Sequence, residues 1–115
     1  MIKIFKTAKS LQDGIDNMMA GAKEDYAQTM GRNDSAYTKQ KLENYESQTT
    51  VKEGKKYIKV IYDRSVFAFI VKEDFKHFRR GDVLKPAGWA APALNQPRGN
   101  VLEGNYPIQW TGPLY

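Results

Sequence analysis

Two runs of strand-forming residues, separated by only two positions, constrain the fold of this chain more than any other feature. Residues 56–62 and 65–71 are dense in β-branched and aromatic side chains, which favour strands. The intervening Asp63 and Arg64 make a link short enough for a β-hairpin, although it lacks the glycine of the preferred two-residue turns. The second run is apolar on both faces, which predicts a central strand covered on each side.

A helix is predicted before this hairpin, over residues 11–30. Ser10 followed by Asp13 resembles a capping box with Asp in place of Glu, and apolar residues then recur at steps of three and four. Gly14 and Gly21 lie inside the stretch, and each costs up to about 1 kcal/mol relative to Ala. The helix therefore needs tertiary packing, either on this protein's own sheet or against a partner or second copy.

The remaining N-terminal signals are weaker. The alternation in residues 1–6 fits a first strand or a frayed start. Residues 33–35 offer N-caps for a second helix that would run to about Glu46, and residues 47–50 read as a connector.

After the hairpin, residues 73–80 fit one helical turn whose two phenylalanines pin it to the sheet. Residues 81–86 fit a turn into a short strand that ends at proline. From residue 86 onward, proline, glycine and aromatic residues predict irregular loops held against the core.

These elements predict an α+β fold. One or two N-terminal helices would pack on a small antiparallel β-sheet, with a Pro/Gly/aromatic-rich C-terminal wrap. We divide the chain into a helical segment, residues 1–50, and a small β-rich core, residues 51–115, within a single domain overall.

The surplus positive charge of the chain falls in one third of it. Residues 51–85 hold ten Lys and Arg against five Asp and Glu, whereas the segments on either side are neutral. A localised basic surface attracts polyanions or acidic proteins, and neighbouring aromatic rings can stack on unpaired bases. Alternatively, the lysines protect a sheet edge and the rings pack in the core. The predicted nucleic-acid or partner-binding residues are Lys55, Lys56, Lys59, Arg64, Lys76, Arg79, Arg80, Lys85, Trp89, Arg98 and Trp110.

The composition argues against catalysis and membrane insertion. There is no cysteine and His77 is the single histidine, which leaves neither a thiol nucleophile nor the usual ligands for zinc. Residues 53–55 match only half of a nuclease carboxylate–lysine motif, because no upstream acid is identifiable. No apolar run approaches the roughly 18 residues that span a bilayer. We therefore predict no enzyme activity, no cofactor, no metal site and no membrane segment.

Several short sequences resemble small uncharacterised proteins of tailed bacteriophages. The most distinctive are GDVLKPAGW at residues 81–89 and RGN at residues 98–100, supported by GKKYIKVI at residues 54–61 and WTGP at residues 110–113. The resemblance covers about residues 54–115. It implies a phage product, located in the host cytoplasm or in the virion, and it carries no assigned activity.

Taken together, the charge and the resemblance predict a non-enzymatic phage accessory binding module. Its basic β-hairpin region would bind nucleic acid or an acidic host or phage protein. The alternatives are an inhibitor or modulator that binds a host protein, or a minor structural protein of the virion. The helix over residues 11–30 offers a surface for a homo-oligomer.

Overall fold

The fold is α+β, as predicted, and contains two antiparallel sheets instead of one. The computed structural model describes residues 1–30 and 36–113. In chain order these residues form β1 (Ile2–Ile4), α1 (Leu11–Met30), α2 (Ala36–Glu43), β2 (Thr49–Glu53), β3 (Tyr57–Tyr62), β4 (Ser65–Val71), β5 (Val83–Leu84), β6 (Tyr106–Gln109) and β7 (Gly112–Pro113).

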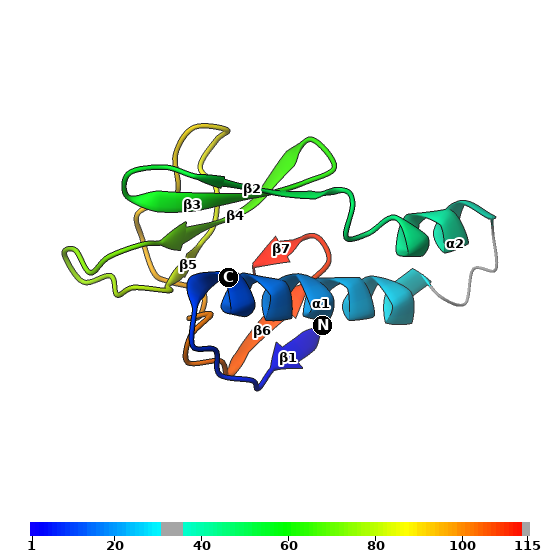
Figure 1. Ribbon diagram of the computed structural model, residues 1–115, viewed down its shortest axis with the longest axis horizontal. Coiled ribbons are helices and arrows are strands. Elements are labelled where there is room, and N and C mark those ends of the chain that lie inside the picture. The colour runs from blue at the N-terminus through cyan, green and yellow to red at the C-terminus, as the bar shows by residue number, and fades with distance from the viewer. Residues whose placement is uncertain (31–35, 114–115) are drawn as a thin grey trace.

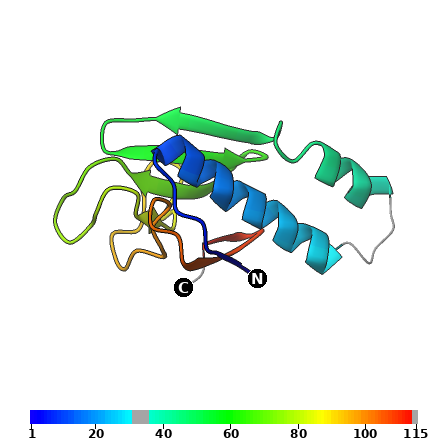
Figure 2. The same cartoon turned by 60° about the horizontal axis from the view of Figure 1, so that its bottom comes forward.

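The long helix α1 forms a common core with both sheets. One sheet has the strand order β2-β3-β4-β5 and the other has the order β1-β6-β7. Figure 1 shows α1 running along the molecule, with β2, β3 and β4 of the larger sheet above it and β1 of the smaller sheet below it, and Figure 2 shows β2 lying alongside the helix. Buried side chains of α1 and of both sheets belong to one core cluster. The apolar stripe of the helix is therefore covered within the chain, and it is not left free for the predicted self-association.

Local interactions explain how α1 begins and why it contains glycines. The Ser10 Oγ accepts a hydrogen bond from the backbone N–H of Asp13 (3.1 Å), as the capping pattern predicts. A Cβ at Gly14 would lie 2.6 Å from the carbonyl oxygen of Val101. A glycine here therefore allows the C-terminal loop to approach the helix backbone closely.

The β3–β4 hairpin is confirmed, and its turn explains the missing glycine. Asp63 and Arg64 both adopt positive φ values, 50° and 82°, as a type I′ turn requires. Further along, the register shifts between Val60 and Ile61, whose partners on β4 are Ala68 and Val66. Phe67 is consequently an extra residue in β4, and it packs in the same core cluster as Ala68.

Other predictions need correction. Thr49 and Thr50, which were expected in a connector over residues 47–50, begin the edge strand β2 because this segment pairs with β3. Residues 73–80 do not form a helical turn: Phe75 and Phe78 exchange backbone hydrogen bonds of 2.9 and 3.1 Å across a two-residue turn. Their rings do pin this turn to the sheet, in a cluster with Tyr57. The predicted N-caps at residues 33–35 lie outside the described residues.

The C-terminal wrap is only partly irregular. Residues 85–105 are loops held by turns and isolated bridges, whereas β6 and β7 complete a sheet with β1. Ile2 stands opposite Ile108 in this sheet, although 106 positions separate them along the chain. Such long-range pairing leaves no local sequence signal, and the second sheet was therefore not predicted.

Two faces of the larger sheet differ in character. The inner face, toward α1, carries aliphatic side chains of the main core, among them Val60, Ala68 and Ile70. The outer face carries a second cluster rich in aromatic residues: Phe69, Val71, Phe78 and Leu84, with Tyr57, Val66 and Phe75 at its margin. The predicted basic residues must be placed relative to this outer face.

Candidate functional site

Two lysines lie directly opposite each other on the outer face of the larger sheet. Lys52 of β2 is the register partner of Lys59 of β3, and Lys59 is in turn the partner of Phe69 of β4. Residues opposite each other in adjacent strands share a face, and Phe69 belongs to the outer cluster. Like charges in this arrangement destabilise a sheet. Among residues 1–30 and 36–113, neither lysine forms an ion pair with a carboxylate.

A tryptophan from the C-terminal loops lies beside these lysines. Residues 86–92 form a small hairpin, closed by a bridge between Pro86 and Pro92, with Trp89 near its tip. The Lys59 Nζ lies 4.4 Å from the centroid of the Trp89 ring, which is a cation–π distance. Trp89 remains 54% exposed. The outer face therefore presents an accessible aromatic ring next to two cations.

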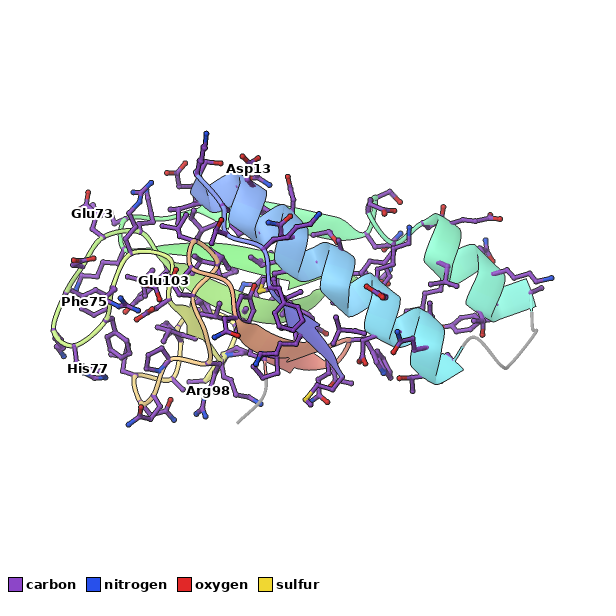
Figure 3. All side chains as sticks on the ribbon, turned by 90° about the horizontal axis from the view of Figure 1, so that it is seen from below. Asp13, Glu73, Phe75, His77, Arg98 and Glu103 are labelled. Carbon is purple, nitrogen blue, oxygen red and sulfur yellow. The ribbon has the colours of Figure 1, made fainter. Side chains whose placement is uncertain are left out.

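More lysines extend this face toward the end of the molecule opposite α2. The Lys56 Nζ lies 5.6 Å from the centroid of the Phe75 ring, which packs edge-on against Tyr57. Lys55 is exposed in the same β2–β3 turn, and Lys76 is exposed at the tip of the 75–78 hairpin. Figure 3 places Phe75 at this end, together with Glu73. We define the basic–aromatic face by four residues: Lys52 of β2, Lys59 of β3, Lys56 of the β2–β3 turn and Trp89 of the 86–92 hairpin.

Two of the predicted arginines form hydrogen bonds and an ion pair with other residues of the chain. The Arg79 guanidinium forms a bidentate pair with Glu103, at 2.6 and 2.8 Å, and this pair raises the pKa of Arg79. Arg80 donates from its side chain to the carbonyl of Lys72 (3.1 Å) and from its backbone to Asp74 (2.7 Å). Both arginines help to hold loops together.

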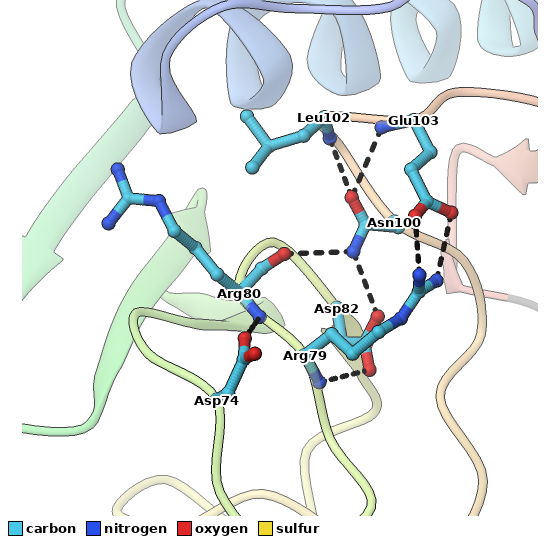
Figure 4. A network of polar contacts seen from close by, with 7 residues as sticks. All are labelled: Asp74, Arg79, Arg80, Asp82, Asn100, Leu102 and Glu103. Atoms are coloured by element: carbon cyan, nitrogen blue, oxygen red, sulfur yellow. Dashed lines mark hydrogen bonds and ion pairs between the residues drawn. The ribbon is translucent and has the colours of Figure 1, made fainter.

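Asn100 is the centre of the network to which these arginines belong (Figure 4). Its Nδ2 donates to the carbonyl of Arg80 and to Asp82 Oδ1, each at 2.9 Å. Its Oδ1 accepts from the backbone N–H groups of Leu102 (2.9 Å) and Glu103 (3.1 Å). Asn100 and Asp82 are buried, so the network joins two loops by satisfying buried polar groups. We interpret it as structural.

The other predicted residues lie elsewhere. Arg64 is in the β3–β4 turn, at the opposite end of β3 from Lys55 and Lys56. Trp110 follows β6 and packs edge-on against Tyr26 of α1, with ring centroids 5.3 Å apart. Lys85 is half-buried directly after β5. Arg98 is half-buried and donates to the Asn95 side chain (3.2 Å). The structure thus groups Lys59 with Trp89 and Lys56 with Phe75, with Lys55 and Lys76 exposed at the same end, and it places Arg64 and Trp110 at the other end.

Sequence reasoning missed Lys52. Its place on the outer face depends on pairing between β2 and β3, and β2 had been taken as beginning in a connector. The alternation of exposed and half-buried residues in Thr49–Glu53 is too short and polar to identify a strand by pattern. A two-strand register would have been needed to place this lysine beside Lys59.

No metal-binding cluster is found in the described parts of the chain. Within residues 1–30 and 36–113, no three His, Cys, Asp or Glu side chains gather as metal ligands would. His77 is exposed, and its Nε2 lies 3.0 Å from the carbonyl oxygen of Asn95. Neither helix described here has the length and apolar character required to cross a membrane.

The fold and this face define an α+β chain with two sheets and a basic–aromatic outer surface. The sequence profile of a family of unknown function (DUF7717) matches residues 3–114. The chain belongs to this family. No curated protein and no solved structure matches it. Its function must therefore be argued from the geometry of its own residues.

Proposed function

We propose that this protein is a non-enzymatic binding module whose basic–aromatic face binds single-stranded nucleic acid. The observation that carries the proposal is the juxtaposition of Lys52 and Lys59, directly opposite each other without a neutralising carboxylate in the described residues. Such a pair lowers the stability of the fold, and an anionic ligand bound between the two ammonium groups would remove that cost. Phosphate groups spaced along a nucleic-acid backbone provide such anions.

The tryptophan favours a single strand over a duplex. Trp89 is more than half exposed and lies within cation–π distance of Lys59. Proteins that bind single strands combine cations for the phosphates with aromatic rings on which unpaired bases stack. In a duplex the faces of the bases are already stacked on one another, so Trp89 would add little to its binding.

The alternative partner is an acidic protein, either from a host or from a virion. It would use the same lysines, but the energy would come mainly from aromatic anchors buried at an interface and would depend less on salt. A phage setting, with location in the host cytoplasm or the virion, rests on the sequence resemblance and stays a prediction.

The test is a titration of the full chain with a fluorescein-labelled 20-nucleotide oligo(dT), followed by fluorescence anisotropy over a series of NaCl concentrations. We expect the logarithm of the affinity to fall with the logarithm of salt concentration by about 0.7 for each phosphate neutralised. Lys52→Gln/Lys59→Gln should lower the affinity at least tenfold and reduce that slope by about one to two.

A charge-matched variant controls for the loss of net charge. Lys6 and Lys9 are exposed and lie before α1, so Lys6→Gln/Lys9→Gln should change the affinity less than threefold. Equal losses in the two double variants, or no binding of oligo(dT) at low salt, would refute the proposal. Binding of an acidic peptide in place of oligo(dT), through the same two lysines, would favour the alternative.

A further inference from the structure

A second cation, Lys41 of α2, is surrounded by aromatic rings at the other end of the molecule. Its Nζ lies 4.9 Å from the ring centroid of Tyr26, 5.4 Å from that of Trp110 and 5.5 Å from that of Tyr62. These three rings come from α1, the β6–β7 turn and β3. We call them the aromatic cage. A cage of this kind attracts alkylammonium groups, because each ring presents a negative face to the cation.

Buried residues behind the aromatic cage hold its rings in place. Tyr45 stacks on Tyr62 with centroids 4.4 Å apart and is itself 1% exposed. The buried carboxylate of Asp25 accepts a hydrogen bond from the backbone N–H of Trp110 (2.9 Å) and forms an ion pair with the N-terminal ammonium of Met1. The rings are therefore held in position by contacts that do not involve Lys41. They would keep their arrangement if that side chain withdrew.

Lys41 is flanked by two hollows, and the carboxylate of Asp63 lines both of them. Two hollows, of about 180 and 260 Å³, are each lined by Lys41, Tyr62 and Asp63. Asp63 is exposed at their rim. In the described parts of the chain, Lys41 forms no ion pair with a carboxylate. The lysine side chain thus divides a larger concave site that combines ring faces with a negative charge.

The helix that carries Lys41 is loosely attached. Within Ala36–Glu43, Thr38 is the single buried residue, and Tyr37 is 71% exposed. Leu42 makes a partial contact with the main core. Figure 1 shows α2 at one extremity of the molecule, away from the loops around β5. Moving α2 outward would therefore withdraw Lys41 while exposing little of the core.

We propose that the aromatic cage is a binding site for an alkylammonium ligand, and that Lys41 occupies it in the free protein as an internal competitor. The ligand is a quaternary ammonium group, carried either by a small molecule or by a methylated lysine side chain of another protein. Binding would displace Lys41 and release α2. Because a tethered lysine has an effective concentration in the millimolar range or above, the free protein should bind such ligands weakly and the protein without Lys41 should bind them well.

The fluorescence of Trp110 provides the measurement. The chain has two tryptophans, so Trp89→Phe leaves Trp110 as the reporter within the cage. In this background we compare Lys41→Ala with Lys39→Ala, which removes the same charge from an exposed position of the same helix. The probes are choline, its neutral isostere 3,3-dimethylbutanol, and a short peptide with either trimethyllysine or unmodified lysine.

We expect Lys41→Ala to bind choline about tenfold or more tightly than the Lys39→Ala protein does, and to prefer choline over the neutral isostere by a similar factor. Tighter binding of the trimethyllysine peptide than of choline would support a protein side chain as the source of the ammonium, and the reverse would support a small molecule. Equal responses to choline and its isostere would overturn the proposal, as would equal affinities in the two variants.

A second measurement avoids the chance that Lys41→Ala disturbs the fold. In the unaltered sequence, the three rings should shift the NMR signals of the Lys41 ε-methylene group upfield. Adding choline should move those signals toward the values of an exposed lysine, while 3,3-dimethylbutanol should not. Lys41 signals that choline leaves in place up to saturating concentration would refute displacement.

Discussion

Each of the two tryptophans in this protein has a lysine over its ring, yet the two pairs are built differently. At the basic–aromatic face, the Lys59 Nζ lies 4.4 Å from the Trp89 centroid, and the ring is 54% exposed. At the aromatic cage, Lys41 lies 5.4 Å from Trp110, but two further rings surround the same ammonium. The first pair is open to water, whereas Lys41 and Trp110 of the second are half-buried, so that pair is partly enclosed.

Because of this difference in solvation, we expect the two lysine–tryptophan pairs to have different roles, one in stability and one in ligand binding. A cation–π contact in water contributes about 0.5–1 kcal/mol, whereas a desolvated one can reach about 2 kcal/mol or more. The enclosed pair should therefore stabilise the fold. The open pair contributes little to the fold and leaves both the ring and the charge available to a ligand. Four predictions test this contrast, beginning with the largest expected effect.

Removing each ring in turn should give unequal losses of stability. Trp110→Ala deletes a half-buried ring that packs on Tyr26, and we expect a loss of about 2–3 kcal/mol, somewhat less than for a fully buried ring. Trp89→Ala should cost less than about 1 kcal/mol. Urea denaturation followed by far-UV circular dichroism measures both values. Similar losses in the two variants would remove the contrast.

Removing each lysine should have unequal effects on the free energy of unfolding. Lys41→Ala loses contacts with three rings and should destabilise the protein by about 1 kcal/mol. Lys59→Ala loses one exposed contact but also relieves the repulsion from Lys52, so its free energy of unfolding should change by less than about 0.5 kcal/mol or rise slightly. The same urea titration decides this, and a larger loss for Lys59→Ala would contradict the comparison.

The enclosed end should also respond to alkaline pH. Burial, and secondarily the nearby Asp63, raises the pKa of Tyr62 from 10.0 to about 12. Between these pH values the folded protein binds a proton that the unfolded chain has lost, so the free energy of unfolding should fall as pH rises from about 10 to 12.

Over this pH range the buried Tyr62 should contribute on the order of 1 kcal/mol. Urea midpoints at pH 9.5 and 11.5 should therefore differ less in Tyr62→Phe than in the unaltered protein. An identical pH response in Tyr62→Phe and in the unaltered protein would contradict this account of Tyr62.

The smallest effect concerns salt. Raising NaCl from 0.05 to 0.5 M should stabilise the free protein by a few tenths of a kcal/mol, because it screens the repulsion between Lys52 and Lys59. Lys52→Gln should lose this increment, whereas Lys6→Gln should keep it. Thermal unfolding monitored by differential scanning calorimetry can resolve the difference, and an unchanged increment in Lys52→Gln would show that the pair is not under repulsion.

The parts of the fold that follow from local pattern were predictable. The helix Leu11–Met30 was expected at residues 11–30, and the β3–β4 hairpin followed from two dense runs of strand-forming residues. By contrast, β2 is short and polar, and β6 has the pattern Tyr-Pro-Ile-Gln. These strands are defined by their partners, and a single sequence does not show which distant segments pair.

The candidate site was predictable only in part, for the same reason. Local sequence placed Lys55, Lys56 and Lys59 near one hairpin, but it could not show that Arg79 and Arg80 turn toward Glu103 and Lys72. The aromatic cage left no sequence signal at all. Its rings and its lysine come from α1, α2, β3 and the β6–β7 turn, which meet only in the folded chain.

The pairing of β1 with β6 has a consequence for how the protein reaches its native state. Ile4 pairs with Tyr106, about a hundred residues further along the chain, so one flank of α1 stays uncovered until that segment has been synthesised. The hairpin flank can form earlier. Nascent chains should accordingly pass through a partly folded intermediate with an exposed apolar surface. We expect chaperones that recognise such surfaces to bind this intermediate until β6 has been synthesised.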